Sequence, residues 1–153
     1  MTFEFYKYDF NLHMENSDKK KIMIGGSMAF ETEAVNVKKA LERIGYEVFV
    51  SLYLDNPKKK SDAESLRDLG GGISDIELAT KVDAVVILNY PNGGVNGYIS
   101  EGAYRDLSVA WWSKKKIFFL FPRDENHNGN KYAMFLFEPI ILDGDVKNIK
   151  KYL

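Results

Sequence analysis

Acidic side chains around one expected helix are the residues of this chain best suited to chemistry. Residues 99–113 carry apolar side chains at helical spacing, and Asp106 falls on the same inward sector. A carboxylate on that face must be paired, hydrogen-bonded or functional, because an isolated buried charge is unstable. We expect no pairing with Arg105, since adjacent residues diverge on a helix. Glu101 suits either a catalytic acid or a plain first-turn acid that favours the helix dipole.

A glycine-rich turn offers a second kind of chemistry. Gly25, Gly26, Ser27 and Met28 follow the apolar segment 22–24 and precede a helical pattern. Their backbone amides, the hydroxyl and the helix start suit an anion or a sugar hydroxyl. The alternative is an ordinary strand-to-helix turn of small residues. The turn is not a Walker A loop, because no Gly-Lys-Ser/Thr follows it.

Three further candidate residues lie in or after the third apolar segment, 82–88. Asp83 stands at its start and is either a solvated loop carboxylate or a site residue. Asn89 and Tyr98 belong to the loop region that follows, and their position makes them candidate site-lining residues.

The elements that must position these residues alternate along the chain. Apolar segments predict strands at 22–24, 47–52, 82–88, 116–121 and 139–142, and helical patterns cover 34–44, 75–81, 99–113 and 145–152. This alternation predicts a single flavodoxin-like α/β domain of three layers with a five-stranded parallel sheet. We assign it to residues 21–153, after an N-terminal extension at 1–20. In such sheets ligands bind beyond the carboxyl ends of the strands, where the glycine turn and the helix at 99 should meet.

The composition of the chain limits the classes of partner that we expect. The chain has 153 residues, 45% of them hydrophobic, and a net charge of −1, so we expect no nucleic-acid polymer and no membrane as partner. There is no cysteine, and His13 and His127 stand alone, so we expect no metal site and no cofactor. No segment resembles a signal peptide or a membrane span, which makes the cytoplasm the default location. Residues 55–72 are polar and glycine-rich, typical of either a lid or a disordered segment.

Four stretches together resemble the nucleoside 2-deoxyribosyltransferase-like superfamily, which includes deoxynucleoside 5′-monophosphate N-glycosidases. Residues 21–30 resemble its opening strand and Gly-Ser-Met turn, and residues 83–89 its third strand with a preceding aspartate. Residues 92–99 resemble the Asn-Gly loop and Tyr-Ile helix entry of one branch, and residues 138–145 its last strand and turn. The order and spacing of the four stretches carry the resemblance.

The resemblance implies cleavage or transfer of the N-glycosidic bond of a (deoxy)nucleoside or its 5′-monophosphate. A helix carboxylate attacks the anomeric carbon, and the glycosyl group then passes to water or to a new base. It implies Asp106 as nucleophile, Asp83 as leaving-base acid or ribose ligand, and Gly26 with Ser27 at the 5′ end of the sugar. A homo-oligomer is also expected from the resemblance.

The chain departs from the family pattern at the nucleophile. Asp106 occupies the position of a family glutamate, and Ser100 and Glu101 stand where two glycines are usual. Aspartate is shorter by one methylene, and a displacement of about 1 Å can lower a rate on the order of a hundredfold. Three outcomes are open. Asp106 attacks the anomeric carbon from an adjusted helix, Glu101 takes over part of the catalytic role, or catalysis is lost. The last case leaves a catalytically inactive nucleotide- or nucleoside-binding or sensing module.

Overall fold

Five parallel strands form one sheet in the order β2-β1-β3-β4-β5. The computed structural model describes residues 17–51, 73–124 and 136–153. The strands are β1 (Lys21–Gly26), β2 (Glu47–Val50), β3 (Ala84–Leu88), β4 (Lys116–Phe119) and β5 (Ile140–Ile141). All neighbouring pairs are parallel, so the predicted five-stranded parallel sheet with flavodoxin-like strand order is confirmed.

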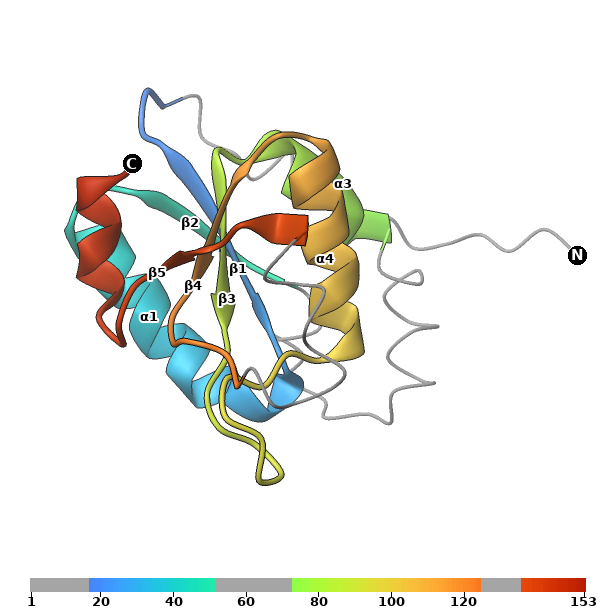
Figure 1. Ribbon diagram of the computed structural model, residues 1–153. Helices are drawn as coiled ribbons and strands as arrows, with labels where there is room; N and C mark the ends of the chain where they lie inside the picture. The colour runs from blue at the N-terminus through green and yellow to red at the C-terminus, as the bar shows by residue number, and fades with distance from the viewer. Residues whose placement is uncertain (1–16, 52–72, 125–135) are drawn as a thin grey trace, which may run out of the picture.

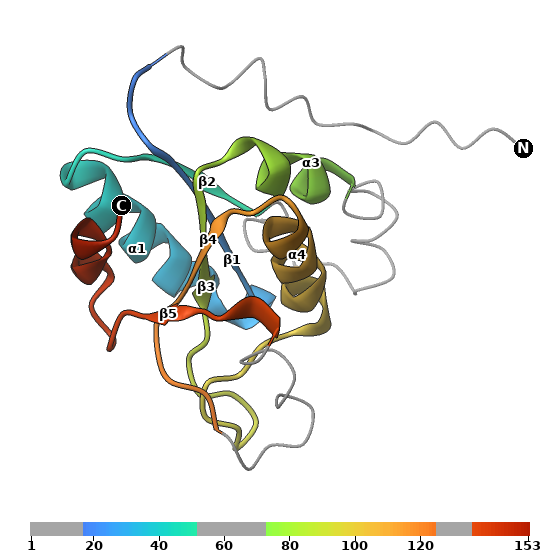
Figure 2. The same ribbon diagram turned by 45° about the horizontal axis from the view of Figure 1, so that its top comes forward.

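Helices cover both faces of the sheet and make three layers (Figures 1 and 2). One face carries α1 (Glu31–Arg43) and the short 3₁₀ helix η5 (Val146–Lys151), and the other carries α3 (Ile73–Lys81) and α4 (Glu101–Trp112). A further 3₁₀ turn, η2 (Met28–Phe30), joins β1 to α1. The alternation of side chains along a strand explains the two cores. In β1, Ile22 and Ile24 pack toward α1, whereas Met23 packs toward α4.

Most elements begin or end one to three residues away from the sequence expectation. Three of the differences lie in the last part of the chain. The last helix, expected at 145–152, is a 3₁₀ helix capped by Asp145, whose Oδ1 accepts a 2.9 Å hydrogen bond from Lys147 N. The fifth strand keeps two residues, and Glu138 and Asp143 on either side of it adopt positive φ angles of 44° and 54°. The fourth strand ends at Phe119 rather than at residue 121. The expected lid at 55–72 and the first sixteen residues of the extension lie outside the described residues.

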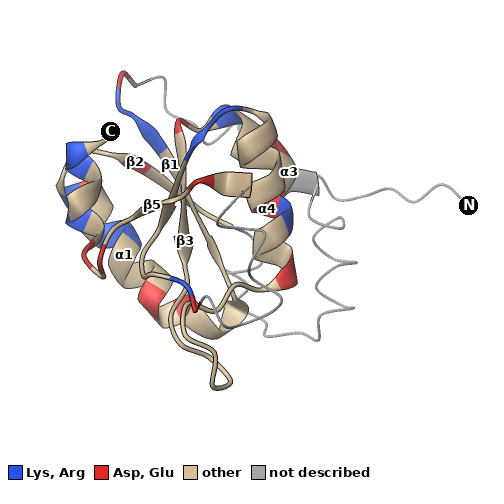
Figure 3. Cartoon of the chain, in the orientation of Figure 1, with Lys and Arg blue, Asp and Glu red and all other residues tan. Residues whose placement is uncertain are grey.

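None of the helices in the described ranges is both long enough and apolar enough to cross a bilayer. Lysines gather at the amino edge of the sheet, where Lys20 and Lys21 enter β1 and Lys116 begins β4 (Figure 3). The carboxyl edge is the end at which the loops after β1 and β3 lie.

The loop after β3 is held against the end of β4 by a glycine. Gly97 has a φ of +62°, and a Cβ on it would lie 2.6 Å from Pro122 O and 2.7 Å from Arg123 Cα. Asp124 N also donates a 3.3 Å hydrogen bond to Asn96 O. Only a residue without a side chain allows the two backbones to approach this closely.

A pair of glycine variants tests this close approach. Gly97→Ala should lower the free energy of unfolding by about 2 kcal/mol more than Gly94→Ala, because overpacking adds to the strain of a positive φ. Gly94 is the matched control, with a φ of +77° and no atom within 4 Å of its added Cβ. Denaturant unfolding measures both, and equal losses would contradict the contact with Pro122.

Candidate functional site

A cavity of about 620 Å³ opens at the carboxyl ends of β1 and β2, beside the first turns of α4. Its volume is in the range of pockets that hold small molecules. It lies where the strand order reverses, between β1 and β3, which is the usual ligand position in such sheets. Its described lining residues are Gly26, Ser27, Met28, Ser51, Tyr98, Ser100, Glu101, Gly102, Arg105 and Asp106.

The cavity brings together six of the nine residues proposed from the sequence. Gly26, Ser27 and Met28 come from the turn after β1, and Tyr98, Glu101 and Asp106 come from the entry and body of α4. Gly25 lies directly behind them: a Cβ on it would be 3.7 Å from Asp106 Oδ2 and 3.1 Å from Ile87 Cδ1.

The turn after β1 is shaped by packing as well as by its hydroxyl. A Cβ on Gly26 would lie 2.9 Å from Leu88 O, so this position excludes a side chain. Ser27 caps η2, and its Oγ accepts a 3.2 Å hydrogen bond from Ala29 N. The hydroxyl proton of Ser27 therefore stays available as a donor toward the cavity.

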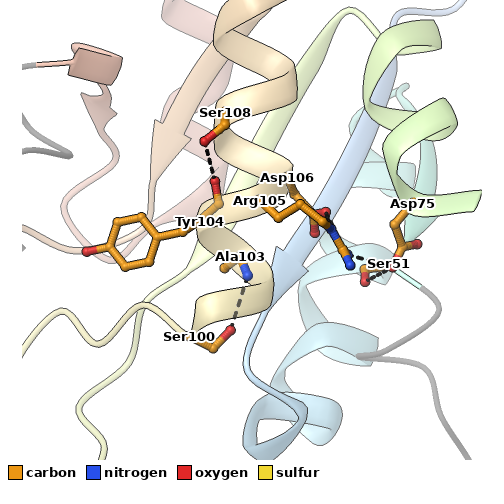
Figure 4. Close-up of polar contacts among 8 residues, drawn as sticks. All are labelled: Ser51, Asp75, Ser100, Ala103, Tyr104, Arg105, Asp106 and Ser108. Atoms are coloured by element: carbon orange, nitrogen blue, oxygen red, sulfur yellow. Dashed lines mark hydrogen bonds and ion pairs between the residues drawn. The ribbon is translucent and has the colours of Figure 1, made fainter. Parts of the chain in front are cut away.

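The start of α4 is fixed by Ser100. The side chain of Ser100 accepts a 3.3 Å hydrogen bond from Ala103 N and acts as the N-cap (Figure 4). Glu101 follows as an exposed first-turn acid that lines the cavity. Its charge favours the helix terminus, so both of its sequence interpretations agree with its place.

Asp106 is buried, with 2% of its surface exposed, and Arg105 holds it. Arg105 Nε and Nη2 donate hydrogen bonds of 3.2 Å and 3.0 Å to Asp106 Oδ1. Our expectation that these neighbours would not pair was wrong. The Cα–Cβ bonds do diverge, but the long arginine stem turns back beside the helix and brings the guanidinium to the carboxylate (Figure 4).

A second buried acid, Asp75 at the start of α3, lies on the other side of the guanidinium. Arg105 Nη2 is 3.8 Å from Asp75 Oδ2, and Ser51 Oγ donates a 2.8 Å hydrogen bond to that same oxygen. Sequence reasoning missed Ser51, Asp75 and Arg105 as site residues. A signal existed, because Ser51 ends β2 and the next helix must begin at the same edge of the sheet.

Burial and a like charge shift the ionisation of Asp106. Removal from water raises the pKa of Asp106 from 3.8 to about 7, and the Asp75 carboxylate adds to the rise. The charge and hydrogen bonds of Arg105 act in the opposite direction. The carboxyl is therefore poised to exchange a proton near neutral pH.

Asp83 lies away from the cavity, which corrects its assignment as leaving-base acid or ribose ligand. Its Oδ2 accepts a 2.7 Å hydrogen bond from Lys21 N, and its Oδ1 is 3.8 Å from Lys20 Nζ. Asp83 precedes β3 and Lys21 begins β1, so both stand at the amino edge of the sheet. The strand length between this edge and the cavity prevents a direct role.

Asn89 is also placed differently from our prediction. It is fully buried, its Nδ2 donates a 2.6 Å hydrogen bond to Phe121 O, and its Oδ1 accepts a 2.8 Å bond from Phe121 N. The side chain ties the end of β3 to the chain after β4. Asn89 thus holds the carboxyl edge together and does not line the cavity.

A buried arginine lies on the opposite flank of α4. Arg123 is 7% exposed, and its Nη2 donates a 3.4 Å hydrogen bond to Tyr104 Oη. Within the part of the chain that the structure describes, its Nε and Nη1 have no hydrogen-bond partner. Burial lowers the pKa of Arg123, with Tyr104 acting against the shift. No cluster of three or more His, Asp or Glu suited to a metal ion occurs among the described residues.

Comparison with known proteins relates this chain to solved structures. No protein-family model and no curated protein sequence matches it. A conserved protein from Enterococcus faecalis V583 is 15% identical, with a TM-score of 0.60 over 88% of this chain and 99% of its own. The CMP N-glycosidase BcmB from Clostridium botulinum is 18% identical, with a TM-score of 0.52 over 88% of this chain and 100% of its own. At these identities the likeness shows a shared fold and nothing beyond it.

The ionisation of Asp106 predicts a pH-dependent stability. The folded protein favours the protonated carboxyl, so this contribution is complete below pH 3.8 and is lost as the pH rises through about 7. Asp106→Asn removes it and still accepts the Arg105 hydrogen bond. The Tm of the variant relative to wild type should rise by roughly 5–10 °C between pH 5 and pH 8. A constant difference across that range would contradict the raised pKa.

The buried guanidinium of Arg123 gives a second stability prediction. Arg123→Met keeps most of the apolar stem and removes a charge that has one weak hydrogen bond to the described residues. The variant should unfold with a free energy about 1 kcal/mol or more above that of wild type, because an unpaired buried charge is destabilising. Denaturant unfolding checks this, with Tyr104→Phe as the control for the lost hydrogen bond. A clear loss of stability would mean that the guanidinium has a stronger partner.

Proposed function

We propose that this protein breaks the N-glycosidic bond of a (deoxy)nucleoside or its 5′-monophosphate, with Asp106 as nucleophile. The observation that carries the proposal is a buried carboxylate on the wall of a small-molecule cavity at the carboxyl edge of the sheet. The fold shared with a CMP N-glycosidase from Clostridium botulinum supports the same class of reaction. The partner is then a small nucleoside or nucleotide.

The proposed chemistry proceeds in two displacements. A lone pair of Asp106 Oδ2 forms a bond to C1′ while the C1′–N bond breaks and its electron pair leaves with the base, which takes up a proton. Water, or a second base, then attacks C1′ and loses a proton, which balances the one taken up by the first base, and the ester electron pair returns to Asp106. Each step passes through an oxocarbenium-like state that a nearby carboxylate stabilises. Whether water or a base accepts the sugar decides between hydrolase and transferase.

The remaining lining residues fit roles around such a ligand. Glu101 is the other acid among the described lining residues and replaces Asp83 as the candidate that contacts or protonates the leaving base. Gly26 and Ser27 offer an amide and a hydroxyl for the sugar, and Tyr98 supplies a hydroxyl or an aromatic face. These assignments rest on position in the cavity.

A binding or sensing module without turnover is the second candidate function. The pKa of about 7 for Asp106 favours it, because the carboxyl is then partly protonated at neutral pH and a weaker nucleophile. Such a module raises its Tm with a deoxynucleotide, since a ligand of the folded state alone stabilises the fold. It releases no base. Measuring both the Tm shift and the release of base on one sample separates the binding module from the enzyme.

A homo-oligomer belongs to the proposal as well. Both tryptophans lie at the end of α4, where Trp111 is 49% and Trp112 81% exposed. Large exposed aromatic side chains favour contact with another chain. Light scattering coupled to gel filtration tests the oligomer, and a monomeric mass at micromolar concentration would remove this part of the proposal.

Base release is the direct test of the enzymatic proposal. Wild-type protein is incubated with deoxynucleosides, ribonucleosides and their 5′-monophosphates, and free base is measured by chromatography. Asp106→Asn should lower the rate on the best substrate by at least about a thousandfold, because the nucleophile is lost. Asp83→Asn is the matched control: it removes an acid outside the cavity and should keep the rate within about twofold. Absence of base release from every compound, with folded wild-type protein, would defeat the enzymatic proposal.

A further inference from the structure

Four polar side chains form a continuous chain of contacts, and three of them, Ser51, Arg105 and Asp106, line the cavity. Ser51 at the end of β2 bonds to Asp75 of α3, Asp75 pairs with Arg105, and Arg105 pairs with Asp106 of the same helix, α4 (Figure 4). Ser51 is itself fixed, because its backbone N donates a 2.8 Å hydrogen bond to Ile24 O of β1. The chain of contacts thus connects the sheet backbone to the Asp106 carboxyl.

The two oxygens of Asp106 have different surroundings. Both Arg105 hydrogen bonds, 3.2 Å and 3.0 Å long, end on Oδ1. Oδ2 accepts neither of them and lies beside Gly25, where a Cβ would be 3.7 Å away. A side chain at Gly25 would therefore come into contact with Oδ2.

We propose that Arg105 is the positioning residue of this site: it fixes Oδ1 of Asp106 and so presents Oδ2 to the ligand. This inference rests on the proposed function and adds a role that sequence reasoning did not assign. Arg105 acts through Asp106 and takes no part in bond making itself.

Arginine suits this role for two reasons. Its planar fork fixes direction as well as charge, which a lysine ammonium does not. In addition, two acids among the described residues are partners of Arg105: Asp106 at 3.0 Å and Asp75 at 3.8 Å. When Asp106 becomes a neutral ester in the proposed reaction, the guanidinium keeps Asp75 as its counter-charge. The cation therefore stays paired at every stage, and the geometry is retained for the second displacement.

The charges that act on Asp106 come from two helices. Asp75 of α3 and Arg105 of α4 are the groups whose charges shift the pKa of Asp106, in opposite directions. β1, β3 and β4 also pack against α4, and the side chains that they bury there are apolar: Met23, Val85, Ile87, Ile117 and Phe119. Among the described residues, Glu101 and Tyr98 are the other titratable groups that line the cavity.

The first test needs no turnover. Tm is measured against pH for wild type and Arg105→Gln, and for each of them with Asp106→Asn added. The difference in Tm between a protein and its Asp106→Asn counterpart reports on the ionisation of Asp106 alone. Arg105→Gln removes a cation within hydrogen-bond distance of Asp106. The pH at which this Tm difference stops changing should therefore rise by about 1–3 units relative to wild type. Lys38→Gln is the matched control. It breaks the exposed Lys38–Glu42 pair of α1, which is 2.5 Å long, and should leave that pH unchanged.

The second test uses the base-release assay. An upward pKa shift of about 1–3 units leaves less ionised Asp106 at pH 7. Arg105→Gln should therefore lower kcat/KM at pH 7 by about 5- to 500-fold and move the acid limb of the pH profile up by the same amount as the pKa. Arg105→Lys keeps the charge and loses the fork. Its acid limb should stay near that of wild type, while kcat falls about tenfold to a hundredfold at every pH. Arg105→Lys also keeps the test decisive if Arg105→Gln does not fold.

The outcomes separate this inference from the function it rests on. An unchanged stability profile in Arg105→Gln overturns the role of Arg105, whatever the activity. Wild-type activity in Arg105→Lys overturns the positioning role and leaves a charge effect alone. If wild type releases no base yet the stability profile shifts as expected, the proposed function fails while the coupling of Arg105 to Asp106 stands.

Discussion

Two carboxylates, Asp75 and Asp106, are buried in one layer of helices, and one guanidinium lies between them. Without the positive charge, α3 and α4 would carry facing negative charges away from water, an arrangement that the fold tolerates poorly. Arg105 therefore does two things at once. It allows α3 and α4 to pack closely, and it places an ionisable oxygen at the wall of a cavity. The candidate site depends on this shared cation.

Much of the fold could be predicted from the sequence because its strands are buried and its helices are amphipathic. The run 84–88 is buried at every position, as its continuous apolar sequence indicated. The ends of elements were predicted less well. Glu138 and Asp143, on either side of β5, have positive φ angles; an aspartate favours such an angle, but nothing in the type of Glu138 signals it.

The candidate site was predicted in part, and the errors have physical causes. Position along the chain located Ser27, Tyr98 and Asp106 correctly at one edge, because helix phase and strand direction fix that edge. Asp83 was misplaced because a residue before a parallel strand lies at the amino edge, a rule that the family resemblance outweighed. Arg105 was excluded because helix periodicity describes Cβ directions. The reach of a long side chain, with two carboxylates attracting it, is a tertiary effect that periodicity does not contain.

The position of the tryptophans has a spectroscopic consequence. The chain holds two, Trp111 and Trp112, and both belong to the last turn of α4. Asp106 stands five residues earlier on the same helix, about 7.5 Å along its axis. Indole emission therefore originates from the helix that carries the candidate nucleophile. The chain thus carries a built-in optical probe of α4, one that needs no added dye.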